Sequence, residues 1–186
     1  MTKSVKQILI INLIVFGITF IFSIYGLYLN NILALYPISS GYFSCYQLIT
    51  HLFAHFNPEH LFYNMLVLLM TGPEVEKHIG KKFWKFYLLS GIFSSGLYCL
   101  NNGGGILGAS GAVFSVMTFA ILISMKGIKT KKYILFRNFF FLFLIFSEAY
   151  SIIFPTGDSI GHGAHLLGTL FGLLYFLYQR NFDHPE

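Results

Sequence analysis

The chain has 186 residues, of which 55% are hydrophobic, 19% are aromatic and only 10% are charged. Soluble domains usually carry about 25% charged residues, so this composition excludes an ordinary soluble enzyme and favours a polytopic membrane protein. The net charge of +5 does not indicate a nucleic-acid partner, because the Lys and Arg residues fall in alternate loops between apolar runs. We therefore expect the lipid bilayer, and no nucleic acid, as a partner.

Apolar runs near the length of a membrane span, roughly 20 residues, predict an all-α fold in one domain over residues 1–186. The first run follows the basic start Lys3 to Lys6 without a small-residue cleavage site, and we interpret it as an uncleaved span. The prediction is a six-transmembrane-helix bundle, with spans near residues 7–29, 58–74, 83–100, 107–125, 133–153 and 161–179.

The distribution of positive charge predicts an orientation. Cations precede the first span, follow the sixth, and lie between the second and third spans and between the fourth and fifth, the last group running from Lys126 to Arg137. The positive-inside rule then places both termini in the cytoplasm. The three outer loops hold Glu59, Glu148 and Asp158. With no organelle transit signal visible, we expect a bacterial plasma (inner) membrane.

The second span has a clear start. Asn57 suits the N-cap, Pro58 the first helical position, and Glu59 the positive end of the helix. The preceding residues 45–56 are then a partly embedded loop, which is tolerated only against protein or water and so indicates a wet cavity on the outer side. Cys45 and Cys99 both fall near that side, where a disulfide is possible, although packed free thiols are more common.

Polar side chains recur at the outer ends of the second, fourth and sixth spans. Ser110 lies in Gly108-Ala109-Ser110-Gly111, and His165 lies in Gly161-His162-Gly163-Ala164-His165. Gly168 and Gly172 form a small-residue face that allows close helix packing and draws the two together. Alone, such a serine is usually a packing residue and such a histidine can be satisfied by a backbone carbonyl; at matched depth they favour a nucleophile and its base.

The same depth holds His60 and Asn64, which share one helical face. Together with the Ser110 N–H they are candidates for an oxyanion hole. The acidic residues Glu59, Glu148 and Asp158 are assigned to loops, so we expect a Ser-His dyad without a carboxylate. Phe114, one turn after Ser110, is a candidate to stack on the imidazole, or is simply one of 22 phenylalanines that pack or face lipid.

A metal site is the rival chemical interpretation, because His51, His55 and His60 cluster and imidazole is a common zinc ligand. No H-E-x-x-H spacing accompanies them. We therefore expect no metal and no cofactor, and we expect His51 and His55 to brace the embedded loop through hydrogen bonds.

These residues resemble the rhomboid family of intramembrane serine proteases over essentially the whole chain. The resemblance rests on four motifs in order: His60 to Asn64 (H-x-x-x-N), Gly72 through Glu76 to Gly80 (G-x-x-x-E-x-x-x-G), Gly108 to Gly111 (G-x-S-G), and Ala164-His165 with Gly168 and Gly172 (A-H-x-x-G-x-x-x-G). It implies that Ser110 is the nucleophile and His165 the general base, with His60, Asn64 and the Ser110 N–H as oxyanion hole. It also implies that His51 and His55 support the loop, and that Glu76 braces the cytoplasmic end.

Two positions depart from the family pattern. Phe114 stands where tyrosine is common, which keeps a ring for stacking and loses a hydroxyl. Tyr46-Gln47 replaces a Trp-Arg pair in the first loop, which leaves the anchoring of that loop open. The chain looks like a minimal six-span form.

The predicted function is hydrolysis of a peptide bond in or near the outer end of a substrate's transmembrane helix. The phenylalanine-rich fifth span, from Phe136 to Phe146, is a candidate lateral gate or an ordinary lipid-facing surface. A catalytically silent rhomboid-like protein that binds membrane clients is the alternative, and the presence of both Ser110 and His165 disfavours it. A small transporter is a third possibility, but it predicts internal symmetry, and none is evident in the sequence. The substrate, its cleavage preference and the oligomeric state are not predicted.

Overall fold

A computed structural model describes residues 1–101, 105–125, 132–155, 157 and 160–182. Within these ranges the chain is helical, so the all-α prediction is confirmed. The long helices are α1 (Lys3–Ile24), α4 (Pro58–Ile79), α5 (Phe83–Asn101), α6 (Ser110–Met125), α7 (Lys132–Ile153) and α8 (His162–Phe182). Short elements are α2 (Asn30–Leu33), α3 (Gln47–Thr50) and the 3₁₀ turns η1 (Ile38–Ser40) and η2 (Gly80–Lys82).

The long helices overlap the predicted spans, but several of their limits differ from the predicted ones. α1 stops at Ile24, five residues before the expected end, because Gly26 adopts φ 76°. The Leu27 N–H then bonds the Phe22 carbonyl at 3.0 Å, in the pattern of a Schellman cap. α4 continues past residue 74 to Ile79, with Pro73 inside it, because charge ends an apolar run without ending a helix.

The start of α4 agrees with its predicted cap. The Asn57 side chain accepts a hydrogen bond from the backbone N–H of His60 at 2.7 Å, and Pro58 occupies the first turn. Glu59 lies exposed in that first turn, at the positive end of the helix where its cap pattern placed it. The cap fixes the point at which the chain turns from the first loop into α4.

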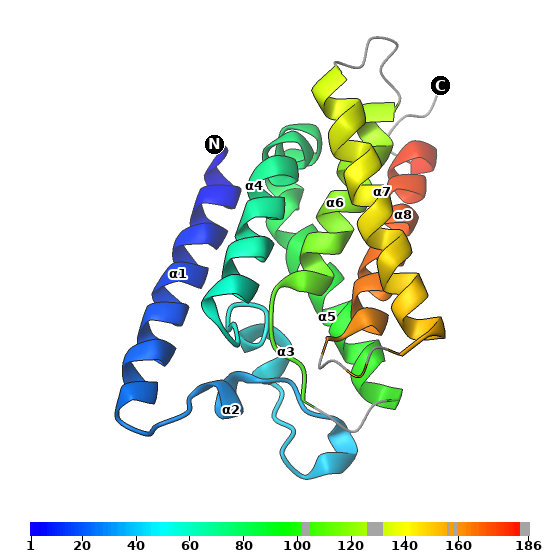
Figure 1. The fold of residues 1–186 in the computed structure, drawn as a ribbon. Helices are drawn as coiled ribbons and strands as arrows, with labels where there is room; N and C mark the ends of the chain where they lie inside the picture. The colour runs from blue at the N-terminus through cyan, green and yellow to red at the C-terminus, as the bar shows by residue number, and fades with distance from the viewer. Residues whose placement is uncertain (102–104, 126–131, 156, 158–159, 183–186) are drawn as a thin grey trace.

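The helices form a bundle whose two ends differ (Figure 1). α1 begins and α8 ends at one end, whereas α2, α3 and the first turns of α4 and α8 lie at the opposite end, called the α3 end below. α6 is the central helix, because ten of its 16 residues are buried. It packs most extensively against α8, and also against α4 and α5.

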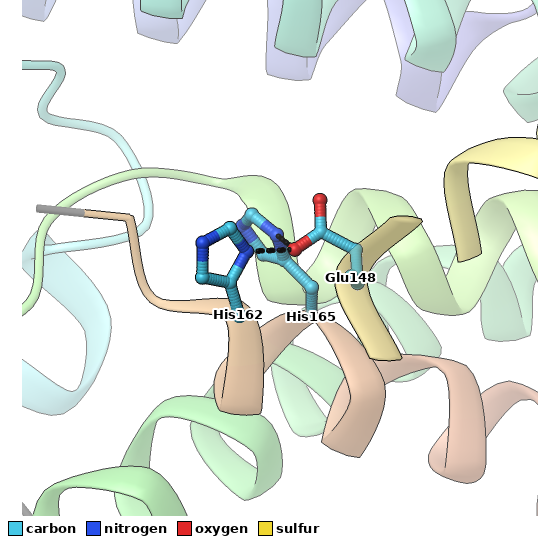
Figure 2. A group of neighbouring side chains, drawn as sticks. All are labelled: Glu148, His162 and His165. Atoms are coloured by element: carbon cyan, nitrogen blue, oxygen red, sulfur yellow. Dashed lines mark hydrogen bonds and ion pairs between the residues drawn. The ribbon is translucent and has the colours of Figure 1, made fainter. Parts of the chain in front are cut away.

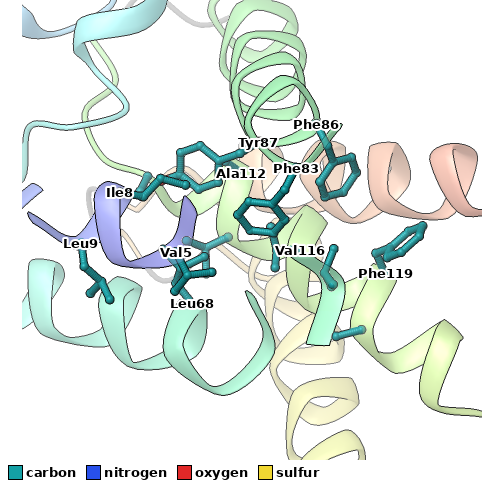
Figure 3. Close-up of a cluster of buried hydrophobic side chains, with 14 of the residues drawn as sticks. Val5, Ile8, Leu9, Leu68, Phe83, Phe86, Tyr87, Ala112, Val116 and Phe119 are labelled. Carbon is teal, nitrogen blue, oxygen red and sulfur yellow. The ribbon is translucent and has the colours of Figure 1, made fainter. Parts of the chain in front are cut away.

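The core is formed where α1, α4 and α5 meet α6 (Figure 3). Fully buried side chains from these helices interlock there: Val5, Ile8, Leu68, Phe83, Phe86, Tyr87, Ala112, Val116 and Phe119. Small residues bring the helices close, since a Cβ on Gly72 of α4 would lie 2.7 Å from the Val5 side chain of α1. Such contact is how helices associate where lipid removes the hydrophobic drive between them.

By length and composition, α1 and α7 are each apolar enough to cross a membrane alone, and α6 is a shorter apolar helix. α7 presents an apolar outer surface, with Phe136, Phe139 and Phe146 each more than 70% exposed. Its inner face is polar at one end. Arg137, predicted to lie in a loop, is a buried residue of α7, 2.7 Å from Glu74 of α4.

Candidate active site

The segment before Ser110 is held by the first loop. Leu35 and Ile106 form an antiparallel bridge, with N–H to carbonyl distances of 2.9 and 2.8 Å. The Gly108 N–H bonds the His51 carbonyl at 2.9 Å, and the Ala109 N–H reaches Nε2 of His55 at 3.5 Å. These bonds hold residues 106–109 against the first loop, and α6 begins at Ser110 rather than at the predicted residue 107.

Gly108 allows this geometry in two ways. It adopts φ 121°, a conformation that side chains rarely tolerate, and a Cβ there would lie 2.5 Å from Cε1 of His60. The His60 ring thus sits over Gly108, two residues before Ser110. Asn64, one turn later and buried, donates one of its two amide N–H groups to the His60 carbonyl at 2.8 Å.

Glycines bring α8 into backbone contact with α6. A Cβ on Gly168 would collide with the Gly111 carbonyl oxygen, and one on Gly172 would lie 2.5 Å from the Ser115 carbonyl oxygen. The contact begins one residue after Ser110 and less than one turn after His165. The first turns of α6 and α8, which carry these two side chains, are therefore packed together at the α3 end.

The ring of His165 is stacked on Phe114. The two rings are nearly parallel, with 6° between their planes and 4.5 Å between their centroids. The side chain of His165 is 12% exposed, and Ser110 is partly buried. Stacking of this kind fixes the plane of an imidazole without any hydrogen bond, so its two nitrogens point along defined directions.

A carboxylate also meets His165, and the expectation that none would do so was wrong (Figure 2). Glu148 belongs to α7, not to a loop, and its Oε2 lies 2.5 Å from Nδ1 of His162 and 3.0 Å from Nδ1 of His165. The contact with His162 is a hydrogen bond, whereas that with His165 is an ion-pair contact without hydrogen-bond alignment. Sequence reasoning missed both Glu148 and His162.

A signal for Glu148 was present in the predicted fifth span. Positions 137, 141 and 148 lie on one face of a helix, because successive steps of four and seven residues return to the same side. Arg137 and Phe141 of that face are buried. An ionisable residue inside an apolar run is expected to face the interior of a bundle. Counting Glu148 as a loop residue ignored that rule.

Comparison with known proteins places these features in one family. The rhomboid-domain model matches residues 42–182. The chain belongs to the rhomboid family. It is similar to the rhomboid protease GlpG of Photorhabdus laumondii, with 26% identity over 150 residues, which is 78% of this chain and 51% of that protein. It is also similar to the rhomboid proteases GlpG of Yersinia pestis and Yersinia pseudotuberculosis, each 29% identical over 141 residues, 73% of this chain and 49% of theirs.

This rhomboid thus spans about half the length of the curated relatives it matches. Membership of the family makes it an integral membrane protein. The apolar outer surfaces of α1 and α7 agree with that environment, since exposed apolar area of this extent is unusual for a soluble monomer.

The first loop of this rhomboid is anchored by Gln47 and two histidines. Gln47 is buried, and its amide bonds the backbone of Tyr42 at 3.0 Å and of Ser44 at 3.1 Å. Nδ1 of His51 donates to the Gln47 carbonyl at 2.6 Å. A glutamine thus does the anchoring at the position where the family often has arginine.

Burial keeps both loop histidines neutral. Desolvation lowers the pKa of His51 from 6.5 to about 4, partly opposed by its hydrogen bond to Gln47. Desolvation, and then the nearby His60, lower the pKa of His55 to about 3. A neutral ring is required at His55, because its Nε2 accepts the Ala109 N–H.

The remaining predicted residues include Glu76, the two cysteines and the residues Asp158 and Lys126. Both oxygens of Glu76 accept backbone N–H groups at the start of α1, from Ser4 at 2.8 Å and Val5 at 3.0 Å, as a carboxylate at a helix N-terminus does. Cys45 is exposed and Cys99 buried, and both are free. Asp158 and Lys126 fall outside the described residues.

Metal ligation has one candidate group in the described part of the chain, and it is not the predicted histidine cluster. Glu148, His162 and His165 each offer one ligand atom within 4.8 Å of the others. Within this group, Nδ1 of His162 is hydrogen-bonded to the Glu148 carboxylate, and Nδ1 of His165 makes an ion-pair contact with the same oxygen. A cavity of about 600 Å³ lies elsewhere, beside Glu74 and Arg137.

Proposed function

We propose that this rhomboid is an intramembrane serine endopeptidase that cleaves transmembrane segments of membrane-protein substrates. Ser110 is the nucleophile and His165 the general base. The observation that carries the proposal is the backbone contact between Gly111 and Gly168, with His165 stacked on Phe114. That contact joins the helix starts that hold an alcohol and an imidazole, in a fold whose curated relatives are named rhomboid proteases.

In the proposed reaction, Oγ of Ser110 attacks the carbonyl carbon of the scissile bond while Nε2 of His165 takes the hydroxyl proton. The carbonyl oxygen becomes an oxyanion. His165 then gives the proton to the leaving amine as the C–N bond breaks, which leaves an acyl-enzyme on Ser110. Water hydrolyses the ester by the reverse sequence and restores the hydroxyl.

The oxyanion is assigned to three donors near the start of α6. The Ser110 N–H belongs to the first turn of a helix, where N–H groups have no partner within the helix. Asn64 keeps a second amide N–H beyond the one bonded to His60. The His60 ring lies over Gly108, beside the same turn. Together they supply fixed dipoles at the place where the negative charge forms.

The proposed topology has six spans, both termini in the cytoplasm and the α3 end facing outward, in a bacterial inner membrane. The substrate's helical peptide bonds are shielded, so its segment must unwind before it reaches Ser110. α7 is the proposed entry side, because its outer face exposes phenylalanines while Arg137 anchors one end to Glu74. Helix-destabilising residues near the cleavage site should favour hydrolysis.

The first prediction tests this function directly. In liposomes, purified chain should cleave a reporter that carries a single transmembrane helix with helix-breaking residues near its outer end. Ser110→Ala and His165→Ala should each lower cleavage by at least about 1,000-fold, because the alcohol and its base act as a unit. The outcome is read as product bands by electrophoresis and mass spectrometry.

Leu13→Ala, on the exposed face of α1 and outside both the proposed site and the proposed entry side, is the control and should cleave at the native rate. Cleavage that persists in Ser110→Ala would contradict the proposal. Native chain that binds the reporter and leaves it intact would instead favour the catalytically silent, client-binding alternative.

A further inference from the structure

The Glu148 carboxylate has no role in a dyad mechanism, yet it occupies a well-defined place beside the proposed base. It is 14% exposed, on the inner face of α7, and one of its oxygens contacts two imidazoles of α8. A largely buried carboxylate is costly unless its charge is compensated, so its position requires the two Nδ1 atoms that meet it. His162 supplies the aligned hydrogen bond and holds the carboxylate in place.

The contact with Glu148 determines which nitrogen of the His165 ring carries the proton. A neutral imidazole carries its proton on one nitrogen only, and the group beside the other nitrogen decides which. Nδ1 of His165 faces Oε2 of Glu148 at 3.0 Å, and Phe114 fixes the ring plane. A carboxylate accepts hydrogen bonds and cannot donate them when ionised, so it selects the form that is protonated on Nδ1. Nε2 is then left with a lone pair.

We propose that Glu148 is a positioning residue that holds His165 in the Nδ1–H form, so that Nε2 is ready to accept the Ser110 proton. The inference rests on the proposed protease function and extends the Ser-His pair to a Ser-His-Glu arrangement. His162 acts one step further out, as the donor that orients Glu148. The carboxylate also stabilises the imidazolium that forms when the proton is transferred.

The arrangement links the base to the proposed entry helix. Glu148 lies on α7, whereas His162 and His165 lie on α8 (Figure 2). Arg137, eleven residues earlier on α7, is tied to Glu74, so the two ends of the helix are held by separate polar contacts. Accordingly, His165 is fully oriented only while the Glu148 end of α7 rests against α8.

The test compares variants of the full chain in liposomes, with active sites counted by a fluorophosphonate so that kcat refers to folded enzyme. Glu148→Gln should lower kcat at least about tenfold and leave KM within about twofold, because the amide can present its N–H to Nδ1 and favour the wrong form. Glu148→Asp should recover part of the loss. Glu59→Gln, the same change at an exposed carboxylate, should match native enzyme.

The protonation of His165 is measured independently on the native protein by solid-state NMR with ¹⁵N-labelled histidine, its signals assigned by their loss in His165→Asn. We expect Nδ1 protonated and Nε2 bare at neutral pH, and a mixture of both forms in Glu148→Gln. A native His165 protonated on Nε2 would overturn the inference, as would a Glu148→Gln kcat within twofold of native. If the native enzyme is active and either of these results is found, only the inference about Glu148 fails and the protease function stands. If the native chain is inactive, the protease function fails, but the NMR experiment still measures which nitrogen of His165 is protonated.

Discussion

Single residues in the first loop control where the proposed nucleophile lies. His51 and His55 bond the backbone of residues 108 and 109, so the position of Ser110 depends on a loop more than 50 residues away in sequence. Gly108 completes the arrangement, because its φ of 121° and the overlying His60 ring leave no room for a side chain. The nucleophile is thus positioned by loop contacts as well as by its own helix.

A pH dependence of stability follows from the two loop histidines. Their folded pKa values are lowered to about 4 and about 3, below the ordinary 6.5, so the unfolded chain binds more protons in between. The stability that the two neutral histidines contribute is fully present above pH 6.5 and is lost as the pH falls towards their folded pKa values. Each should cost about 1.4 kcal/mol of unfolding free energy per pH unit below 6.5. Denaturant unfolding in detergent between pH 7.5 and pH 5 measures it.

His55→Gln is the matched variant, because its side-chain oxygen can still accept the Ala109 N–H and does not titrate. It should lose about half of the histidine contribution to the slope. An identical slope in the variant and the native protein would show that His55 does not stay neutral when folded.

At this scale the sequence predicted what local chemistry decides. The Asn57 cap followed from residue types next to one another and is confirmed at 2.7 Å. Glu148 was missed because its partners lie on another helix, 14 and 17 residues further along the chain. Only the tertiary packing of α7 on α8 reveals that contact, although the inward face of an apolar helix pointed to it.

Among the helices, the α6–α8 pair carries most of the proposed site. Small residues at 111, 168 and 172 remove the side chains that would separate the two backbones. The predicted small-residue face of the sixth span is therefore where the structure packs that helix. The exact helix limits were less predictable. Gly26 ends α1, and hydrogen bonds between the first loop and residues 106–109 keep that segment out of α6.

Replacing Gly168 by alanine tests this contact. The new Cβ would meet the Gly111 carbonyl, and neither backbone can rotate away as a side chain would. We expect a loss of about 2 kcal/mol in unfolding free energy and a marked drop in fluorophosphonate labelling. Unfolding in detergent and gel fluorescence measure the two effects.

Gly96→Ala is the control, because Gly96 lies within helix α5 and a Cβ at this position would meet no atom within 4 Å. It should leave stability unchanged or raise it by up to about 1 kcal/mol, as alanine favours helix. Equal stability of the Gly168 and Gly96 variants would mean that α6 and α8 are not in backbone contact.

For the molecule as a whole, composition and hydropathy were enough to predict an all-helical membrane protein and the approximate place of each long helix. Four spaced motifs predicted the family, which the match over residues 42–182 supports. The orientation of the chain and the number of its spans stay predictions, because both are defined relative to a membrane and the helical fold alone does not test them. The contact between Glu148 and His165 could not be predicted as long as Glu148 was assigned to a loop.

Ser110 at the α3 end of the bundle is the proposed nucleophile, and His165 activates it. A fluorophosphonate labels activated serines. Mass spectrometry of the labelled peptides identifies which residue carries the adduct. We expect one adduct per chain on Ser110, absent from Ser110→Ala and reduced at least about 100-fold in His165→Ala. An adduct on another serine, or labelling of Ser110 that is unchanged in His165→Ala, would contradict this assignment.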